Sequence, residues 1–339
     1  MKRFFLGIAC LFVATVWGEI EDLTKRNQDF ILETKQILFQ DFPNSFNPSL
    51  VEFNDNYLLT FRFSPDVNYQ PWISHIVVVL LNQEFSPISK PQIIETRQGG
   101  GSIPSQAEDA RVFSYRGRNF IIYNDNTEVV FPTYHDRRDL YLAELFFKEG
   151  IFSLSAPQKL FCSQKSAQLW QKNWVPFEWN QALFFGYMVV PHEILYPNLY
   201  TGECYSCYRT EMDFVWEGGM IKGGTPALPV DGEYLSFFHS SKYMSSNVSQ
   251  GFDLWHYFMG AYTFSSKPPF AIKKVSPYPI IEEGFYDEGF SYKKVIFPGG
   301  FVVKGDKVFL AYGKDDSEIW IAVIDLERLK NSLVSVGEK

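Results

Sequence analysis

Short apolar runs alternate with turn-forming residues along most of this chain. From residue 46 onward, stretches rich in aromatic and β-branched residues are separated by loops that contain Asn, Asp, Pro or Gly. This pattern is typical of an all-β sandwich, barrel or propeller, because such side chains suit a pleated, half-buried surface. Aromatic residues make up 18% of the chain, with 33 Phe and 19 Tyr, which strengthens the expectation of strands.

One sequence unit recurs five times, and this repetition distinguishes between the three candidate folds. Each copy has a polar loop, a strand, a turn with Gly or Asp and a second strand, and the copies cover residues 47–62, 108–123, 172–187, 223–239 and 297–312. Five copies at intervals of roughly 60 residues predict a five-bladed β-propeller, which we place at residues 46–330. Apolar runs between the copies would supply the outer strands of each blade, at residues 75–81, 140–146 and 258–264.

A different periodicity precedes the repeats. Within residues 22–40, apolar side chains fall on one face at helical spacing, namely Leu23, Phe30, Ile31, Ile37 and Leu38. We therefore expect an N-terminal helix and lead-in over residues 19–45.

The first residues predict export. A basic start, Met1-Lys2-Arg3, is followed by the apolar run 4–17 and then by Gly18-Glu19. This is the pattern of a cleaved secretory signal, here residues 1–18, and it predicts a secreted or periplasmic protein. The run is short of the ~20 apolar residues that a membrane span needs. No later segment has the pattern of a span, so we expect none after removal of the signal.

The net charge limits the classes of binding partner, and the cysteines bear on the redox state of the compartment. The formal net charge of −8 becomes −10 when Lys2 and Arg3 leave with the signal, which disfavours nucleic acid and anionic membranes as partners. Beyond the signal, the cysteines are Cys162, Cys204 and Cys207. The pair in Cys204-Tyr205-Ser206-Cys207 has no second pair with which to hold zinc, so one structural disulfide in an oxidising compartment is the favoured interpretation.

A propeller also predicts where chemistry gathers. The start of each innermost strand lies at the central channel, so the polar residues that open the copies should converge there. These include Asn47, Asp109, Asn173 and Thr225.

Five motifs, in this order, resemble the mannoside-phosphorylase family of glycoside hydrolases. They are Phe46-Asn47-Pro48, Glu108-Asp109-x-Arg111, Lys172-Asn173, Gly224-x-Pro226 through His239, and Phe297-Pro298-Gly299 through Asp316. The resemblance spans about residues 46–325. It implies a five-bladed propeller that cleaves or forms a β-mannoside-like bond of an oligosaccharide or glycan with inversion. It implies no cofactor and no metal.

The resemblance assigns the general acid to Asp109. The family motif is Glu-Asp-Pro-Arg, and Ala110 stands here in place of the Pro. Glycosidic cleavage needs a carboxyl group that donates its proton to the leaving oxygen. A purely structural alternative is that Asp109 caps a turn or pairs with Arg111. Contacts with the sugar are implied for Asn47, Arg62, Glu108, Arg111 and Asp316.

In the family's phosphorylases, cations and hydrogen-bond donors hold phosphate. The resemblance maps these groups onto Lys172, Asn173, His239 and Tyr257, and a further family Lys falls by count near Met220, two residues from Lys222. Lys172 replaces an Arg, so it keeps the charge without the bidentate fork that suits phosphate. A hydrogen-bonded core histidine is the alternative for His239.

Three functions remain open at this point. They are a glycosidase or glycoside phosphorylase, an inverting glycosyltransferase on the same scaffold, and a sugar-binding propeller without catalysis. Export disfavours phosphorolysis and nucleotide-sugar transfer, which need cytosolic-type pools, whereas His239 and Tyr257 favour phosphate or a sugar phosphate as a partner. Hydrolysis would need a second carboxylate, for which Glu178 and Asp125 are candidates. The candidates for stacking on sugar faces are Trp174, Trp179 and Trp255.

Overall fold

The structure is a computed structural model, which describes residues 21–24, 28–66, 73–96, 105–130, 135–165, 167–289 and 291–338. Strands dominate these residues, and no helix among them is long and apolar enough to cross a bilayer. The predicted signal at residues 1–18 lies outside the described residues.

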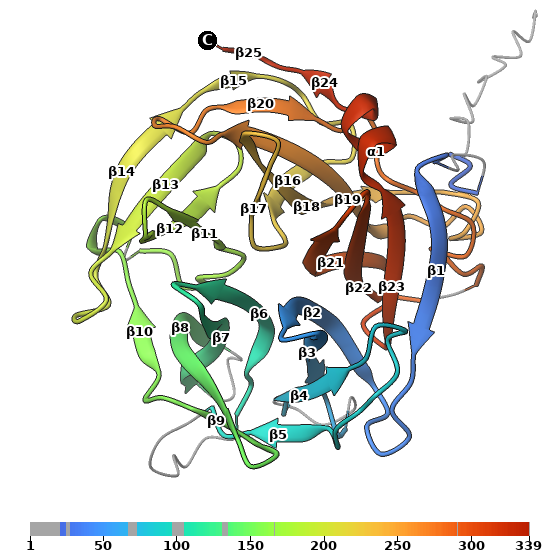
Figure 1. Ribbon diagram of the computed structural model, residues 1–339. Coiled ribbons are helices and arrows are strands. Elements are labelled where there is room, and N and C mark those ends of the chain that lie inside the picture. Colours follow the sequence, from blue (N-terminus) through green and yellow to red (C-terminus); the bar gives the residue numbers. More distant parts are fainter. Residues whose placement is uncertain are drawn as a thin grey trace, which may run out of the picture.

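Five antiparallel blades stand around a central axis, as predicted (Figure 1). The first contains β2 (Ser45–Phe53), β3 (Asn56–Phe63), β4 (His75–Leu81) and β5 (Gln92–Ile94). The second contains β6 (Glu108–Tyr115), β7 (Arg118–Val130), β8 (His135–Lys148), β9 (Ile151–Leu154) and β10 (Gln158–Leu160). The third contains β11 (Val175–Trp179), β12 (Ala182–Met188), β13 (His192–Pro197) and β14 (Cys204–Thr210).

The last two blades are joined to each other. The fourth contains β16 (Met220–Gly223) and β17 (Leu228–Val230), which both pair with β18, then β18 (Glu233–Met244), β19 (Leu254–Ser265) and β20 (Ile272–Val275). The fifth contains β21 (Lys293–Lys304), β22 (Lys307–Lys314), β23 (Glu318–Asp325) and β1 (Ile31–Ile37). A short parallel contact between β19 and β21 links the two sheets.

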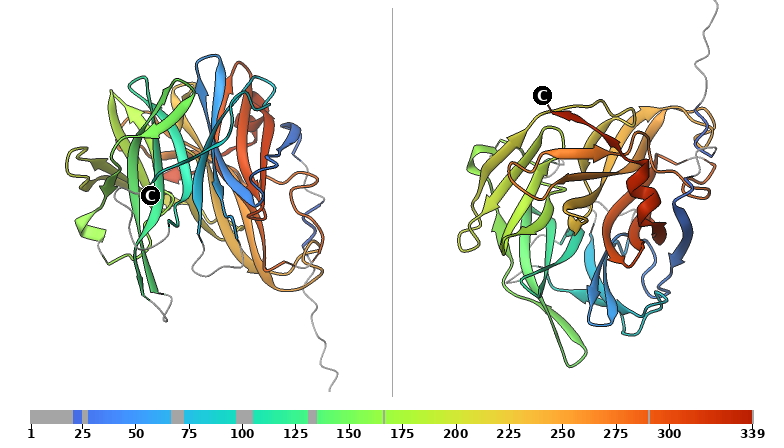
Figure 2. Two further views of the ribbon diagram at one scale, coloured as in Figure 1. Left: turned by 90° about the horizontal axis from the view of Figure 1, so that it is seen from below. Right: turned by 45° about the horizontal axis from the view of Figure 1, so that its top comes forward.

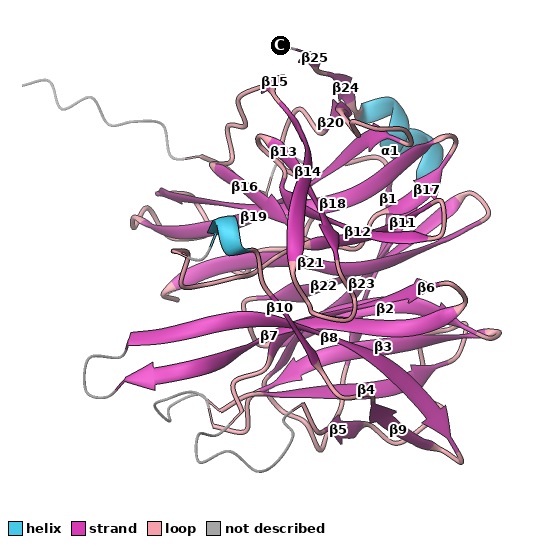
Figure 3. Cartoon of the chain, turned by 90° about the vertical axis from the view of Figure 1, so that its left-hand side faces the viewer, coloured by secondary structure: helices cyan, strands magenta, loops and turns pink. Residues whose placement is uncertain are grey.

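The remaining elements are short and peripheral. They are a 3₁₀ turn (Ser163–Lys165), β15 (Met212–Asp213), the helix α1 (Leu326–Ser332), β24 (Val334–Ser335) and β25 (Gly337–Glu338). β7 and β8 form a long hairpin that projects beyond the body of the ring (Figure 3).

The strands run from one face of the ring to the other (Figure 2), and each blade packs against two neighbours. β4 shows the consequence. Val77, Val79 and Leu81 enter one buried cluster, whereas Ile76, Val78 and Leu80 enter another on the opposite side of the sheet. Because successive side chains of a strand point to opposite faces, a strand between two cores reads as a continuous apolar run.

The N-terminal segment closes the ring, and the predicted helix over residues 22–40 is wrong. β1 pairs antiparallel with β23, from Ile31 opposite Ile324 to Ile37 opposite Ile319. Without β1, the outer edge of β23 would present a row of unpaired backbone N–H and C=O groups. The edge that β1 covers belongs to β23, near the other end of the sequence. The local periodicity of residues 22–40 therefore could not reveal the pairing. The fifth blade therefore includes residues that precede the predicted boundary at residue 46.

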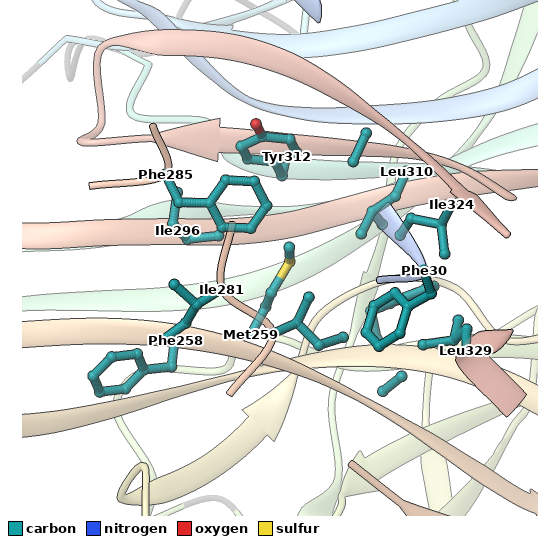
Figure 4. Close-up of a cluster of buried hydrophobic side chains, with 14 of the residues drawn as sticks. Phe30, Phe258, Met259, Ile281, Phe285, Ile296, Leu310, Tyr312, Ile324 and Leu329 are labelled. Carbon is teal, nitrogen blue, oxygen red and sulfur yellow. The ribbon is translucent and has the colours of Figure 1, made fainter. Parts of the chain in front are cut away.

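The cluster between the fourth and fifth blades fixes both ends of the described chain (Figure 4). Phe30 precedes β1, Leu329 belongs to α1, and both are buried beside Ile324. The side chain of Asp325 caps α1 by accepting a hydrogen bond from the backbone N–H of Arg328, at 2.9 Å.

The cysteines differ from the prediction of one disulfide. Cys162, Cys204 and Cys207 are all free thiols, with Cys207 exposed and the others buried. Cys204 and Cys207 lie three residues apart in the extended strand β14. At about 3.3 Å per residue their Cα atoms are about 10 Å apart, beyond the ~7 Å limit for a disulfide.

Candidate active site

A cavity of about 460 Å³ lies where the inner strands of the five blades meet. Its volume falls within the range of small-molecule sites, about 300–1,000 Å³. Its walls are Phe46, Asn47, Arg62, Ser64, Glu108, Asp109, Trp170, Lys172, Asn173, Lys222, His239, Tyr257, Lys293, Val295, Phe297 and Asp316. Every blade contributes to this list, so the convergence expected of a propeller takes place.

A local backbone feature directs three of these side chains toward the axis. Asn47, Asp109 and Asn173 adopt left-handed conformations, with φ values of 49°, 53° and 62°. At Asn47 and Asp109 the register of the inner strand with its neighbour also shifts. Asn and Asp tolerate the left-handed region better than most residues, and a bulge re-aims a side chain. The same device recurs in successive blades.

Asp109 is held in a network that spans several blades. Asn47 Nδ2 donates a hydrogen bond to Asp109 Oδ1 at 2.8 Å. Arg111, which is buried, donates to the backbone oxygens of Asp109 and Gly224 at 2.5 and 2.8 Å and to Asn173 Oδ1 at 3.1 Å. These contacts fix the backbone at Asp109 while its carboxylate lines the cavity.

Glu108 has the opposite environment. Its carboxylate lies 2.7 Å from Arg138, 2.8 Å from Lys172 and 3.2 Å from Arg62. Burial opposes ionisation of Glu108, but the charges of Arg62, Lys172 and Arg138 hold its pKa well below its usual range. Glu108 is therefore a carboxylate anion that organises three cations.

His239 is a neutral histidine in the wall. Burial lowers its pKa to about 3, and the nearby charges of Arg111 and Lys222 act in the same direction. Its ring packs on Phe297, with centroids 4.6 Å apart, and stacks on Tyr257 at 6.4 Å. In β16, Lys222 lies in register with His239, which places this lysine at the cavity.

Lys293 and Asp316 form an ion pair in the wall of the cavity. Burial works to lower the pKa of Lys293, but the charge and hydrogen bond of Asp316 outweigh it, and the net pKa is raised. Lys293 also lies 5.9 Å from the ring centroid of Tyr257.

Three buried polar atoms of the cavity wall have no hydrogen-bond partner among the described residues. They are Asn47 Oδ1, Arg62 Nε and His239 Nδ1. Buried polar groups in folded proteins nearly always have partners, so these three atoms are exceptions within the wall of the cavity.

Comparison with known proteins agrees with this geometry. The profile of glycoside hydrolase family 130, described as β-1,4-mannooligosaccharide phosphorylase, matches residues 19–334. The chain belongs to this family. Members of glycoside hydrolase family 130 are hydrolases or phosphorylases that act on β-mannosidic linkages. No protein of curated function matches the sequence.

Solved structures share the fold at low sequence identity. A mannose phosphorylase from Leishmania mexicana, in complex with phosphate, has a TM-score of 0.58 and 13% identity, over 91% of this chain and 92% of that one. A β-1,2-mannobiose phosphorylase from Listeria innocua, in complex with β-1,2-mannobiose, has a TM-score of 0.57 and 14% identity, over 88% and 92%. A family 130 structure described in connection with hydrolases that target β-1,2-mannosidic linkages in Candida mannan has a TM-score of 0.57 and 12% identity, over 84% and 85%.

The structure brings together nearly all the residues that the sequence proposed for the family 130 site. All line the cavity except Arg111, which lies behind the wall and is directed at protein groups. Thr225, expected at the channel, is fully buried and hydrogen-bonded to the backbone N–H of Phe237 at 3.0 Å.

Several expected side chains lie elsewhere. Neither Glu178 nor Asp125 lines the cavity; Glu178 accepts from the backbone of Arg116, and Asp125 from the backbone of Gln106. Trp174 is buried and Trp179 packs against a hydrophobic core, so neither is available for stacking.

Sequence reasoning missed Trp170, Lys293 and Arg138. Trp170 lies in the segment that leads into β11, two residues before Lys172, and Lys293 is the first residue of β21. Extending the expected convergence to the residues just before each repeat would have included both. Arg138 is a long-range contact of Glu108 for which the sequence holds no local signal. Among the described residues, no group of three or more His, Cys, Asp or Glu side chains is arranged to hold a metal ion.

Proposed function

We propose that this protein is an inverting β-mannoside phosphorylase in which Asp109 is the general acid and inorganic phosphate is the nucleophile. One observation carries the choice of phosphate. Of the carboxylates that line the cavity, Glu108 is bound by three cations and Asp316 by Lys293, whereas Asp109 is in no salt bridge among the described residues. The nearby guanidinium of Arg111 is bonded instead to backbone oxygens and to Asn173.

This distribution bears on the reaction because an inverting hydrolase needs two working carboxylates, one as acid and one as base for water. A phosphorylase needs only the acid, since phosphate attacks directly. Asp109 is the carboxylate of the cavity wall that is outside a salt bridge in the described part of the chain. Lys222 is a cation of the same wall that has no carboxylate partner there.

The reaction then follows from the positions of these groups. A terminal mannosyl unit occupies the cavity, and Asp109 donates its proton to the glycosidic oxygen. An oxygen of phosphate attacks C1 from the opposite face of the sugar, the bond from C1 to the glycosidic oxygen breaks, and the β-linkage becomes an α-mannosyl phosphate. The shortened saccharide leaves with the proton, and Asp109 regains one from solvent.

Lys222, His239 and Asn173 are the proposed phosphate site. Lys222 supplies charge, and the neutral ring of His239, in register with it, lines the same part of the cavity. Lys172 acts differently from the family arginine it replaces, because its ammonium group is held by Glu108 at 2.8 Å. We assign Lys172 to the support of Glu108 rather than to phosphate alone.

The experiment is incubation of the purified protein with β-1,4- and β-1,2-linked mannobiose and mannotriose, with phosphate or with sulfate as the control anion. Phosphorus NMR and sugar chromatography follow the products. Mannose 1-phosphate that forms only with phosphate supports the proposal. Free mannose released at the same rate in both buffers would show a hydrolase, and longer saccharides formed from a nucleotide sugar would show a transferase.

We also propose that the protein is exported through the signal at residues 1–18. Support comes from the basic start, the short apolar run and the small residue before Glu19. Phosphorolysis then requires phosphate in the receiving compartment. N-terminal sequencing of the protein from a secreting host should begin at Glu19, and a retained Met1 would contradict the proposal.

A further inference from the structure

We propose that Tyr243 and Trp255 form an aromatic platform at the mouth of the cavity, which binds the sugar units on the leaving-group side of the cleaved bond. The inference rests on the proposed function, and it extends that function to substrate length. It makes saccharides longer than a disaccharide the preferred substrates.

The strand register places this pair beside the cavity. Tyr243 of β18 lies directly opposite Trp255 of β19, and Trp255 lies in register with Lys293 of β21. The next row inward contains Tyr257 and Val295, which are in register with each other. Because residues two apart on a strand share a face, the platform continues the wall formed by Tyr257, Val295 and Lys293.

The pair extends outward from the ring. β16 covers the edge of β18 only as far as Ser241, which lies opposite Met220. Tyr243 is the next residue on that face, beyond Met220, the first residue of β16. The platform therefore stands above the cavity rather than within it.

Both rings are exposed although they contact each other. Tyr243 is 59% exposed and Trp255 49%, and their ring centroids are 5.6 Å apart in an edge-on arrangement. Neither side chain makes a hydrogen bond or ion pair with the described residues. Exposed aromatic side chains that adjoin a binding pocket are typical of a ligand contact, because they offer a large apolar face at low conformational cost.

The course of the cavity wall determines where the rest of the substrate lies. Neighbouring inner strands touch at two places: a Cβ atom on Gly299 would lie 1.9 Å from the backbone oxygen of Pro48, and one on Gly223 would lie 2.2 Å from that of Asn173. A saccharide therefore cannot pass between the blades at these places. Because the wall formed by Tyr257 and Lys293 continues in register to Trp255 and Tyr243, we place the units that follow the terminal one on this pair.

The test measures how affinity depends on saccharide length. Binding of β-linked mannobiose, mannotriose and mannotetraose to the Asp109→Asn protein is followed by calorimetry, so that no turnover is needed. We expect affinity to rise from di- to tetrasaccharide. The double change Tyr243→Ala, Trp255→Ala should weaken tetrasaccharide binding about 2–12-fold more than disaccharide binding, the ratio that corresponds to 0.5–1.5 kcal/mol for an aromatic contact.

Two further variants test whether weaker binding reflects misfolding rather than loss of the aromatic contact. Trp255→Tyr keeps a ring and should restore most of the length dependence. Tyr200→Ala removes a residue that is 97% exposed in the turn between β13 and β14, at the end of the third blade away from the cavity, and should bind like the parent. Equal weakening for all lengths, or no length dependence in the parent, would overturn the platform.

The outcome is separable from that of the proposed function. Length-dependent binding that requires Trp255, in a wild-type protein that cleaves nothing, supports the platform and refutes the phosphorylase. Phosphate-dependent cleavage, together with binding that is independent of saccharide length, supports the phosphorylase and refutes the platform.

Discussion

Asn47 and Asp109 belong to neighbouring blades, and the amide of Asn47 donates a hydrogen bond of 2.8 Å to the carboxylate of Asp109. Both residues have left-handed backbones in bulged inner strands. The carboxylate of the proposed acid is therefore oriented by a residue that belongs to a different sheet.

The first prediction follows from this pair. Asn47→Gly removes the amide but tolerates the left-handed backbone. We expect kcat to fall about 10- to 100-fold, since a displacement of ~1 Å at a reacting group can have that effect. KM should change little. Asn54→Gly is the matched control, because Asn54 also has a positive φ, 51°, but lies exposed at the other end of β2. Equal losses in both variants would contradict a role for the hydrogen bond.

Glu108 gives a prediction about stability. Glu108→Gln removes the carboxylate that pairs with the half-buried Arg62 and the buried Arg138. Loss of one partner of a buried ion pair costs about 3–5 kcal/mol, and we expect the free energy of unfolding in urea to fall by that amount. Glu144→Gln breaks the more exposed pair with Arg118 and should cost at most about 1 kcal/mol. Similar values for the two variants would refute the proposed organising role.

The buried histidines predict a pH dependence of stability. Burial lowers the pKa of His239 to about 3 and that of His192 to about 4, from 6.5 in an unfolded chain. The unfolded state therefore binds more protons below pH 6.5, so stability is full above that pH and falls as the pH decreases toward the folded pKa values. Between pH 6.5 and about 5.5, unperturbed aspartate and glutamate side chains stay more than about 90% ionised, so the loss of stability comes mainly from histidine. Urea unfolding at these two pH values should show a smaller difference for His239→Gln than for the wild type, and an unchanged difference would contradict the burial argument.

Lys222 tests the phosphate site. Lys222→Ala should raise the apparent KM for phosphate about tenfold, the low end expected for an exposed charge-assisted hydrogen bond. The KM for mannoside should change much less, and added salt should weaken phosphate binding by the wild type. Met220→Ala is the control, because Met220 lies on the same strand and is 70% exposed. A normal KM for phosphate in Lys222→Ala would remove this lysine from the site.

Much of the fold and the site could be predicted from the sequence. The repeated unit depends on local chemistry, namely a polar bulge such as Asn47 or Asp109 followed by apolar strands, and each copy carries that signal. In a propeller, the first residues of every repeat lie around one axis. The polar residues that begin the repeats were therefore sufficient to predict most of the cavity wall.

The errors involve interactions between distant segments. The apolar residues near Phe30 fit a helix, but the open edge of β23 required a strand. Counting along the chain could place the family lysine only near Met220, two residues from Lys222, because the register of β16 with β18 that brings Lys222 opposite His239 is a long-range feature. The three cations around Glu108 also come from separate parts of the chain, so their pairing was not visible in any motif.

The central claim is that Asp109 donates the proton to the leaving oxygen. Asp109→Asn keeps the shape and the hydrogen bond to Asn47 but has no proton to donate as an acid. A dinitrophenyl β-mannoside has a leaving group that departs without protonation, so its cleavage should not need the acid.

The decisive measurement is kcat/KM of Asp109→Asn relative to wild type on two substrates, mannotriose and the dinitrophenyl mannoside, both with phosphate. We expect a loss of about 10²–10⁴-fold on mannotriose, the usual magnitude of general acid catalysis, and a much smaller loss on the dinitrophenyl mannoside. Equal losses on both substrates, or full activity on mannotriose, would contradict the role of Asp109 as the general acid.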